Sequence, residues 1–409
     1  MKRLISCVLA LLYIMAGFAS GTWILHGKEY REDTLYHAYI GPGTTQTSIK
    51  LAGPVNLRVF YTTTDLKNEN VDVRAIKHKD TLTGLGTVSN AAESHSTSNR
   101  SYFAGINADF FSSSRPCGIT VVDGEVYCSD QASGWSLFGI DANKIPYSGG
   151  GDFYVKLTAP DYSTAELSAM NLERETNGLV LYSSRKGANT GTDGNGSEVV
   201  LIPDGEGNFL TPGATVRMRV QGNPNHAGSM PIPDNGYILS GSGTKESFVS
   251  NLSEGDEVEV RCAIRFNGFT GGKIQQALGG CPMLVSGGKV LDTENALDHL
   301  TSAQPRTAVG YNAEKNKLVM LVADGRSSIS VGPISKVLAD IMIYAGCSEA
   351  MNFDGGGSST FYVKGEGVIN QPSDGSERSV TDGLYLSTDA PQNDMTITTI
   401  RFMDYAKTL

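Results

Sequence analysis

The chain has 409 residues, 40% hydrophobic and 19% charged, which is the composition of a globular protein and not of a disordered one. Its formal net charge of −10 argues against nucleic acid as the main partner, because phosphate contacts need a basic surface. The 48 glycines against 15 prolines, with no G-X-Y period, indicate many tight turns and a strand-rich fold.

The N-terminus has the pattern of an export signal. Lys2-Arg3 gives a basic start, Leu4 to Phe18 is an apolar run, and Gly17-Phe18-Ala19 is a small-x-small cleavage signal. We predict a signal peptide over residues 1–19 and an exported protein, periplasmic or extracellular. No later stretch is apolar and long enough to span a membrane, so we expect no transmembrane segment in the mature chain.

Export would permit disulfides. Of the six cysteines, Cys7 lies in the predicted signal, so five remain and at least one is unpaired. Cys117 and Cys128 flank a predicted hairpin and are the best candidate pair. No C-x-x-C or Cys/His spacing typical of zinc occurs, so we expect no metal and no cofactor.

The first part of the mature chain is predicted to consist of strands and turns, up to about residue 86. Segments 56–61 and 71–76 alternate apolar and polar residues, as half-buried strands do. Thr87 to Ser96 is predicted to be a short helix with a hydroxyl N-cap.

A buried strand is predicted over residues 102–106, and it runs directly into two polar residues, Asn107 and Asp109. Local turn hydrogen bonds at a strand end would explain these two side chains without any function. Residues 118–127 form a predicted hairpin with an Asp-Gly turn, which is the strongest short-range hairpin signal.

From about residue 150 to 275 the chain changes character. Turn clusters recur there, separated by short strands such as 214–220 and 257–264. We interpret this segment as a β-rich insertion or subdomain. The expected fold class is therefore α+β, with strand-rich mixed sheets, a few packed helices and this insertion.

The C-terminal part contains a strand, a helix and a second strand in close succession. A strand begins at Arg306, and the buried strand 317–323 ends in Asp324-Gly325-Arg326. Gly332-Pro333 then opens an amphipathic helix that ends near Ala345. If the strands on either side of the helix are neighbours, their charged loops lie close together. Residues 391–409 are predicted to be a C-terminal strand or tail.

The stretch after the helix is the most unusual in the chain, because Asp354 is followed by Gly355-Gly356-Gly357 and then by Ser358-Ser359. Glycine runs cost backbone entropy and add nothing to a core. Successive glycine amides can bind an anion, and a carboxylate beside them can act on it. A plain glycine turn between two strands is the alternative interpretation.

Several polar groups therefore stand at predicted strand ends. Two arginines can bind a phosphate or carboxylate, and a carboxylate can serve as general base or nucleophile. The chain has no G-x-S-x-G and no histidine within these motifs, so Ser-His-Asp chemistry has no support. The groups are Asn107, Asp109, Arg306, Asp324, Arg326, Asp354, Ser358 and Ser359.

Five motifs in order resemble those of the phosphodiester glycosidase family, over about residues 40–388. They are Gly105-Ile106-Asn107-Ala108-Asp109-Phe110-Phe111, Gly279-Gly280-Cys281-Pro282-Met283-Leu284-Val285, Pro305-Arg306-Thr307-Ala308-Val309-Gly310, Asp324-Gly325-Arg326 and Asn352-Phe353-Asp354-Gly355-Gly356-Gly357-Ser358-Ser359. The resemblance implies a secreted or lumenal catalytic domain, here over residues 20–390. It also implies hydrolysis of a sugar-1-phosphodiester, on a small molecule or a glycan, to free sugar and a phosphomonoester.

Within that reaction we expect Asp354 to be the nucleophile or to activate water. Arg306 and Arg326 would bind the phosphate, and Asn107 and Asp109 would position sugar hydroxyls. The backbone of Gly355, Gly356 and Gly357, with Ser358 and Ser359, would complete the anion site. Asp109 and Asp324 are the other candidate catalytic carboxylates, although Asp324 could instead be structural and pair with an arginine.

Two departures from the family pattern bear on these roles. Ala108 stands where the family often has a second glycine, and Gln304 stands where it often has a histidine. Two other functions remain open. One is an exported carbohydrate- or cell-wall-binding protein that keeps the pocket without the chemistry. The other is a metal-dependent phosphodiesterase, which would need the clustered His/Asp ligands that the motifs lack.

Overall fold

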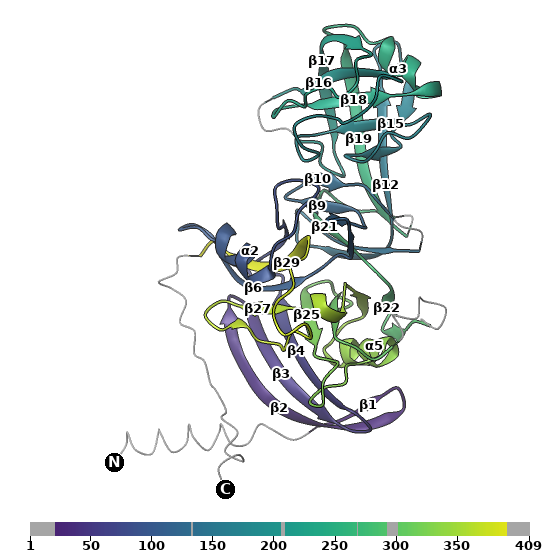
Figure 1. Cartoon of the computed structure of the whole chain (residues 1–409). Coiled ribbons are helices and arrows are strands. Elements are labelled where there is room, and N and C mark those ends of the chain that lie inside the picture. The colour runs from purple at the N-terminus through teal and green to yellow at the C-terminus, as the bar shows by residue number, and fades with distance from the viewer. Residues whose placement is uncertain (1–20, 132–133, 206–208, 268, 293–301, 391–409) are drawn as a thin grey trace.

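The computed structural model describes residues 21–131, 134–205, 209–267, 269–292 and 302–390. The predicted signal peptide and the C-terminal tail lie outside these residues. Strands dominate the described chain and few helices accompany them, which confirms the predicted fold class. The molecule is elongated, with strands β1 to β4 at one end and the strands of residues 158–257 at the other (Figure 1).

A nine-stranded antiparallel sheet forms the lower part of the body. Its spatial order is β1 (Thr22–Leu25), β2 (Lys28–Gly41), β3 (Thr44–Ala52), β4 (Asn56–Asp65), β25 (Lys317–Ala323), β24 (Arg306–Tyr311), β26 (Glu349–Asn352), β22 (Met283–Ser286) and β23 (Lys289–Val290).

A smaller antiparallel sheet packs on one face of the first. Its order is β28 (Gly367–Val368), β27 (Phe361–Val363), β6 (Ser101–Asn107), β29 (Asp382–Thr388) and β5 (Asp72–Lys77). Helix α2 (Val88–His95) packs against this sheet, with Val88, Ala91 and Ala92 buried and the Thr87 hydroxyl capping its first turn through the Asn90 amide. The predicted helix 87–96 is therefore confirmed.

Strand β25 shows why the central strands are continuous apolar runs in the sequence. Leu318, Met320 and Val322 lie in the core between the two sheets. The alternate residues, such as Leu321, face a second core on the opposite side of the sheet. Side chains alternate across a strand, so a strand that is covered on both faces needs an apolar residue at every position. Full burial of each such side chain stabilises the folded state by about 1.5–3 kcal/mol.

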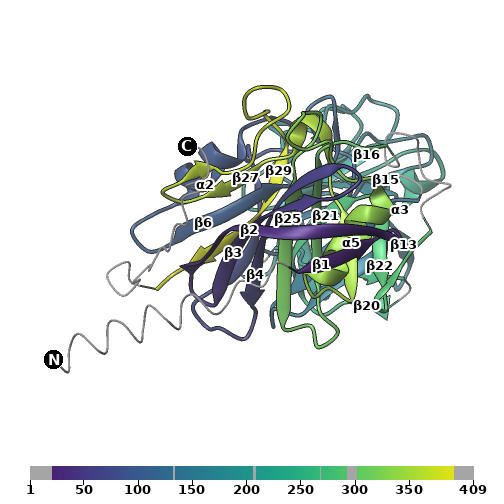
Figure 2. The same ribbon diagram turned by 90° about the horizontal axis from the view of Figure 1, so that it is seen from below.

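Helix α5 (Ser335–Tyr344) covers that second core, and the view from below places it against the sheet beside β1 and β22 (Figure 2). Val337, Leu338, Ile341 and Met342 are buried, as the predicted periodicity requires. The helix begins two residues after Pro333, because the intervening Ile334 has an extended backbone.

The third sheet extends from the body to the far end of the molecule. It is a mixed sheet through the single parallel pair β14–β15, and the short strands β13 and β20 pair with β12 and β19 outside its main order. Its order is β10 (Glu125–Cys128), β9 (Thr120–Val122), β21 (Ile274–Gly280), β11 (Ser136–Asp141), β12 (Pro146–Thr158), β19 (Glu257–Phe266), β17 (Thr215–Asn225), β16 (Ser197–Pro203), β18 (Tyr237–Gly241), β15 (Leu179–Tyr182) and β14 (Ala169–Met170), with β13 (Thr164–Glu166) and β20 (Phe269–Thr270) at the side.

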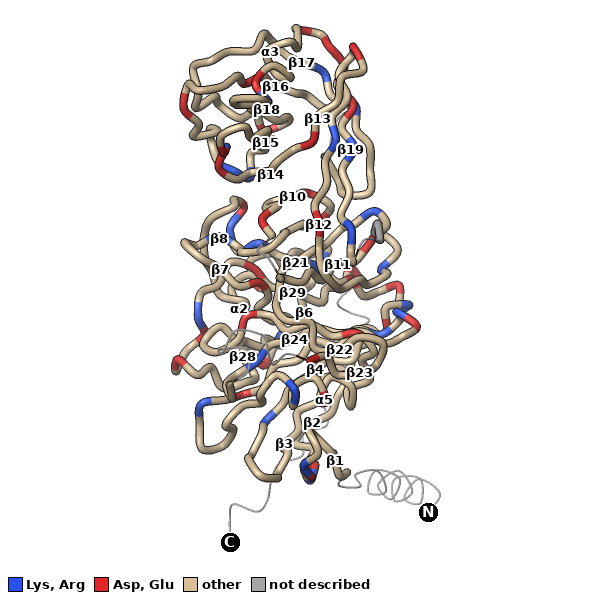
Figure 3. The backbone as a smooth tube through the Cα atoms, turned by 90° about the vertical axis from the view of Figure 1, so that its right-hand side faces the viewer, with Lys and Arg blue, Asp and Glu red and all other residues tan. Residues whose placement is uncertain are grey.

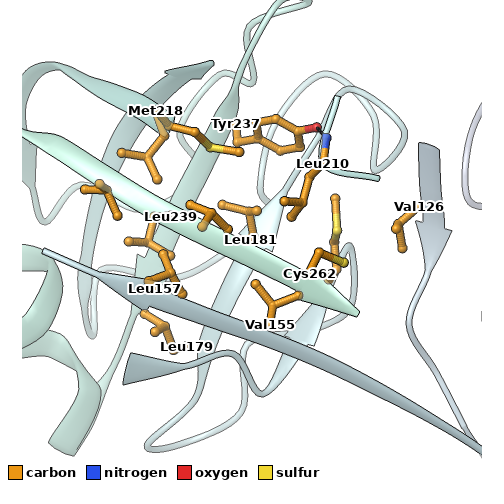
Figure 4. Close-up of a cluster of buried hydrophobic side chains, with 14 of the residues drawn as sticks. Val126, Val155, Leu157, Leu179, Leu181, Leu210, Met218, Tyr237, Leu239 and Cys262 are labelled. Carbon is orange, nitrogen blue, oxygen red and sulfur yellow. Dashed lines mark hydrogen bonds between the residues drawn. The ribbon is translucent and has the colours of Figure 1, made fainter. Parts of the chain in front are cut away.

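The far end has a hydrophobic core that continues along the sheet into β9, β10, β11 and β21. The long strands β12 and β19 connect it to the body, and helix α3 (Glu246–Ser250) lies there too (Figure 1). Figure 4 shows this core, in which the Tyr237 hydroxyl accepts a 2.9 Å hydrogen bond from the Leu210 amide among side chains such as Leu181 and Leu239. The predicted β-rich insertion corresponds to this region, although its bounds as a separate domain stay a prediction.

The predicted Cys117–Cys128 disulfide is wrong, because the five cysteines from Cys117 to Cys347 are unpaired. The predicted hairpin does form, as β9 and β10, but its register places Cys128 opposite Thr120 and not opposite Cys117. Burial raises the pKa of the Cys128 thiol to about 12.

Charged residues of both signs are interspersed along the backbone (Figure 3). In the described chain no helix is both long and apolar enough to cross a membrane.

Candidate functional site

Three neighbouring strands of the large sheet bring charged residues to the same end of the sheet. Strand β24 is antiparallel to both β25 and β26, and its first residue, Arg306, pairs with Ala323 at the end of β25. The end of β26 meets the same edge, since Asn352 pairs with Ala308. The strands on either side of α5, β25 and β26, are not direct neighbours, because β24 lies between them. The loops that follow β25 and β26 still lie at the same end of the sheet, beside the start of β24.

The small sheet delivers the other half of the site. Strand β6 ends at Asn107, which pairs with Gly383 on β29, so that Asp382 lies beside the turn after β6. The two halves are joined by a 2.8 Å hydrogen bond from the Asp354 amide to the Ala108 carbonyl. The Cys281 amide donates to the Asn352 carbonyl at 2.9 Å, which brings the Gly279-Gly280-Cys281-Pro282 motif to the same place.

Asn107 is fully buried and serves as the link between these loops. Its side-chain amide donates to the Asp354 carbonyl at 2.7 Å. Its Oδ1 accepts from the Thr307 hydroxyl at 2.8 Å and from the Thr360 amide at 3.1 Å. These contacts hold the loop that carries Asp354, whereas the sequence had suggested a contact with sugar hydroxyls.

The three glycines after Asp354 are crowded on every side. A Cβ on Gly355 would lie 2.7 Å from the Pro305 carbonyl, and one on Gly356 would lie 3.0 Å from the Arg326 guanidinium. Gly356 also has a φ of 61°, which favours glycine. A Cβ on Gly357 would overlap the guanidinium of Arg378. The glycine run thus lets two arginines approach the backbone from either side.

The backbone amides of this run are mostly used within the protein. The Gly356 amide donates to the Pro305 carbonyl at 2.9 Å, and the Ser358 and Ser359 amides donate to the Gly355 and Gly356 carbonyls at 3.2 and 3.3 Å. The Gly355 amide bonds the Asp354 carboxylate. The expected anion cradle of glycine amides is therefore largely filled, and the arginine side chains are the donors left at the surface of the loop.

Arg326 and Arg378 differ in what fixes them. Arg326 is exposed, has a φ of 58°, and donates to Gln304 Oε1 at 2.9 Å. Arg378 pairs with Asp374, with 2.6 Å between Nη2 and Oδ2, and donates to the Ser358 hydroxyl at 3.4 Å. The Arg378 side chain is 40% exposed, so it can reach a ligand in solution.

Asp354 is half-buried beside these groups. Burial raises the pKa of its carboxyl to about 6, while the Ser358 hydroxyl, the Arg378 charge and the Gly355 amide act in the opposite direction. A carboxylate with this pKa is mostly ionised at neutral pH and can still accept a proton, which suits a general base.

Asp109 is 1% exposed. The Gly118 amide donates a 2.8 Å hydrogen bond to its Oδ2, and a Cβ on Gly279 would lie only 2.7 Å from the same oxygen. The Asp109 amide donates to Asp382 Oδ1 at 2.9 Å. Burial and then the Asp382 charge raise the pKa of the Asp109 carboxyl well above its usual range. Asp109 is therefore a buried carboxyl group whose pKa is raised, and the Asp354 charge adds to that rise.

Arg306 and Asp324 are both buried, at 1% and 2% exposure. Arg306 donates to the Ser302 carbonyl at 2.6 Å and the Pro333 carbonyl at 3.5 Å. Burial, and then the charge of Arg326, lowers the pKa of Arg306 to about 10. Asp324 Oδ1 accepts from the Gln371 amide at 2.8 Å. Both residues are bonded to the loops of the site, and their predicted phosphate-binding and catalytic roles stay predictions.

The remaining predicted residue, Ser359, is buried too, and its hydroxyl accepts from the Thr307 hydroxyl at 3.2 Å. The sequence reasoning missed Arg378, Asp382 and the buried Lys77.

The described residues contain no group of three or more His, Cys, Asp or Glu side chains arranged to hold a metal ion. A cavity of about 450 Å³ lies elsewhere, lined by residues such as Glu125, Phe209 and Tyr237.

Part of the chain that carries this site matches a known protein family. Residues 213–387 match the phosphodiester glycosidase family. The match confirms the resemblance over the span that carries Arg306, Arg326 and Asp354, and it leaves Asn107 and Asp109 outside the matched residues.

One related sequence is the uncharacterized SPbeta prophage-derived protein YomE of Bacillus subtilis strain 168, at 40% identity over 88 residues. That stretch is 22% of this chain and only 13% of YomE, so the chain spans a small part of this relative.

Three solved structures align with most of the chain. A hypothetical protein from Synechocystis has a TM-score of 0.64 at 16% identity, covering 85% of this chain and 62% of that one. A protein of Burkholderia pseudomallei K96243, described as a candidate exported protein, has a TM-score of 0.64 at 18% identity, covering 90% and 98%. The catalytic domain of zebrafish N-acetylglucosamine-1-phosphodiester alpha-N-acetylglucosaminidase has a TM-score of 0.44 at 13% identity, covering 87% of each chain. The first two likenesses, both under 25% identity, concern the fold alone.

Proposed function

We propose that the protein hydrolyses a sugar-1-phosphodiester, releasing free sugar and a phosphomonoester. The observation that carries this proposal is the meeting of Asp354 with Arg326 and Arg378 around the glycine run. The phosphodiester glycosidase match over residues 213–387 supports the same reaction class.

The phosphate would lie between Arg326 and Arg378. Guanidinium groups bind phosphate oxygens through paired hydrogen bonds, and both side chains reach the surface on either side of Gly356 and Gly357. This revises the phosphate-binding pair expected from the sequence, because the guanidinium of Arg306 is buried against backbone carbonyls. The pair stabilises the negative charge that develops on the departing phosphate.

Asp354 would act on the sugar carbon. In the simplest mechanism the Asp354 carboxylate removes a proton from water, and the water oxygen forms a bond to the anomeric carbon. The bond from that carbon to the phosphate oxygen then breaks. The phosphomonoester leaves with the electron pair of that bond, and Asp354 later returns its proton to solvent. Phosphate is a good leaving group, so this reaction depends less on a strong general acid than ordinary glycoside hydrolysis does.

We further propose that this chemistry takes place outside the cytoplasm and belongs to carbohydrate metabolism. The export signal pattern at residues 1–19 supports this location, and one of the structures with the same fold is described as a candidate exported protein. The substrate class would be a small molecule or a glycan that bears a sugar-1-phosphodiester.

The test is incubation of the purified protein with a UDP-sugar and with a simple sugar-1-phosphodiester, followed by measurement of free sugar and phosphomonoester. Asp354→Asn should lose turnover and keep the unfolding transition of the parent. Asp141→Asn is a matched control, since Asp141 is another buried carboxylate bonded to backbone amides, on β11. Binding of the sugar without hydrolysis by the parent would favour the non-catalytic alternative.

A further inference from the structure

A buried carboxyl group lies behind the candidate site and takes no part in the chemistry proposed above. Asp382, the first residue of β29, is 1% exposed. Its Oδ1 accepts the 2.9 Å hydrogen bond from the Asp109 amide, and its Oδ2 accepts one of 3.0 Å from the Thr381 hydroxyl. Asp382 therefore anchors the turn on which Asp109 stands.

A buried lysine accompanies this carboxyl group. Lys77 on β5 is 2% exposed, stands opposite Asp382 in the backbone register of the neighbouring strand β29, and donates to the Thr381 carbonyl at 3.1 Å. Burial lowers the pKa of Lys77, and the negative charge of Asp382 is the first of the influences that oppose this. The lysine thus supplies one positive charge beside two buried carboxyl groups.

One ammonium group can balance only one of the two carboxylates. A second negative charge in the same buried space would be uncompensated, which is costly. Asp109 Oδ1 is buried without a hydrogen-bond partner among the described atoms, whereas both oxygens of Asp382 are bonded. Burial raises the pKa of both carboxyl groups, and the Lys77 charge opposes the rise at Asp382, so Asp109 is the group that takes up a proton first and Asp382 is the one that keeps the negative charge.

That charge also acts on Asp354. Burial is the main cause of the raised pKa of Asp354, and the Asp382 carboxylate contributes in the same direction as the smallest of five influences. The Asp354 charge also raises the pKa of Asp109, although it is the smallest of the causes there.

We propose that Asp382 is a positioning residue of the site. Through the Asp109 amide it holds the turn whose Ala108 carbonyl accepts the Asp354 amide, and its carboxyl group lies with Asp109 and Lys77 in one buried cluster behind Asp354. The inference deepens the proposed function and rests on it, in that hydrolysis is taken to require an ionised Asp354.

Other titratable groups face these carboxyls from the surrounding elements, and the pH dependence belongs to the set. Around Asp354 and Asp109 they are Arg378, Arg326, Cys117, Cys128 and Lys77, and around Asp382 they include Tyr385.

The experiment compares the pH profile of kcat and KM for the parent, Asp382→Asn and Asp382→Glu, with Asp141→Asn as the control for loss of a buried carboxylate. In the parent, kcat should fall as the pH drops through about 6, where Asp354 takes up its proton. Asp382→Asn removes the neighbouring negative charge and should move this acid limb to lower pH. KM should change little, because the phosphate contacts are made by Arg326 and Arg378. Asp382→Glu keeps the charge and should keep the limb in place.

A lower acid limb in Asp382→Asn, with the limb kept in Asp382→Glu and in Asp141→Asn, supports the proposal. The same limb in all four proteins, with only the unfolding temperature or the overall rate lowered, overturns it and leaves Asp382 a structural residue. If Asp382→Asn does not fold, Asp382→Ser replaces it, since serine is uncharged and can still accept the Asp109 amide hydrogen bond.

A readout without substrate separates this inference from the proposed function. In protein with ¹³C-labelled aspartate carboxyls, the Asp354 resonance, assigned by its loss in Asp354→Asn, should titrate at a lower pH in Asp382→Asn than in the parent. A shift in a protein that hydrolyses nothing would uphold the charge coupling and reject the enzyme. An unchanged Asp354 titration would reject the coupling even in an active enzyme.

Discussion

The role of Asn107 is the prediction that most clearly separates two interpretations of the site. Its side chain makes three hydrogen bonds, to the Asp354 carbonyl, the Thr307 hydroxyl and the Thr360 amide, at 2.7, 2.8 and 3.1 Å. The side chain is fully buried. Asn107→Ala would leave all three partners without it, and water cannot easily replace the lost bonds.

The expected loss of stability follows from these contacts. A hydrogen bond contributes about 1 kcal/mol net, and a buried group left unsatisfied costs about 1–3 kcal/mol, so Asn107→Ala should lower the free energy of unfolding by about 3 kcal/mol or more. Thr307→Val removes the hydroxyl that bonds Asn107 and Ser359 but leaves the Thr360 and Asp354 contacts, so about 1 kcal/mol is expected. Urea unfolding followed by tryptophan fluorescence measures both, since Trp135 packs on Phe110 with ring centroids 5.0 Å apart.

The two interpretations give opposite results. If Asn107 instead contacts the sugar, Asn107→Ala should keep the stability of the parent and lose kcat/KM. A free energy of unfolding within about 1 kcal/mol of the parent would therefore refute the anchoring role.

The remaining predictions concern the two arginines and a glycine. Arg326→Ala and Arg378→Ala should each raise KM roughly tenfold to a hundredfold, because each removes charged hydrogen bonds to phosphate. The control variant Arg217→Ala, on the exposed face of β17, should leave KM unchanged. An unchanged KM in both Arg326→Ala and Arg378→Ala would show that the phosphate does not bind at this loop. Gly279→Ala should lower the free energy of unfolding by about 1–3 kcal/mol, because the new Cβ would lie 2.7 Å from Asp109 Oδ2 and 2.8 Å from the Gly118 Cα. Equal stability in denaturant titrations of Gly279→Ala and the parent would show that the contact is not tight.

Local patterns predicted the framework of the site well. The apolar run of β25, the periodicity of α5 and the Asp-Gly hairpin of β9 and β10 each depend on residues close in sequence. The motif around Asp354 also stood out, since three glycines after a carboxylate are unusual. The structure then gives the physical reason for the glycines, which is the close approach of Arg326 and Arg378.

Long-range pairing explains what the sequence could not show. Asp382 reaches the Asp109 amide across 273 residues, through the pairing of β29 with β6, and nothing in the Thr-Asp-Gly triplet around it indicates a buried charge. Arg378 is a single arginine in a turn-rich loop. Arg306 stood correctly at the mouth of a strand, but the direction of its guanidinium depends on the Ser302 and Pro333 carbonyls.

The bond that breaks is the most direct test of the proposed function. Hydrolysis of a sugar-1-phosphodiester in water enriched in oxygen-18, followed by mass spectrometry of both products, shows which atom the water attacks. The label should appear in the free sugar and be absent from the phosphomonoester, and Asp354→Asn should release neither product. Label in the phosphate would mean attack at phosphorus, and it would contradict a glycosidase centred on Asp354.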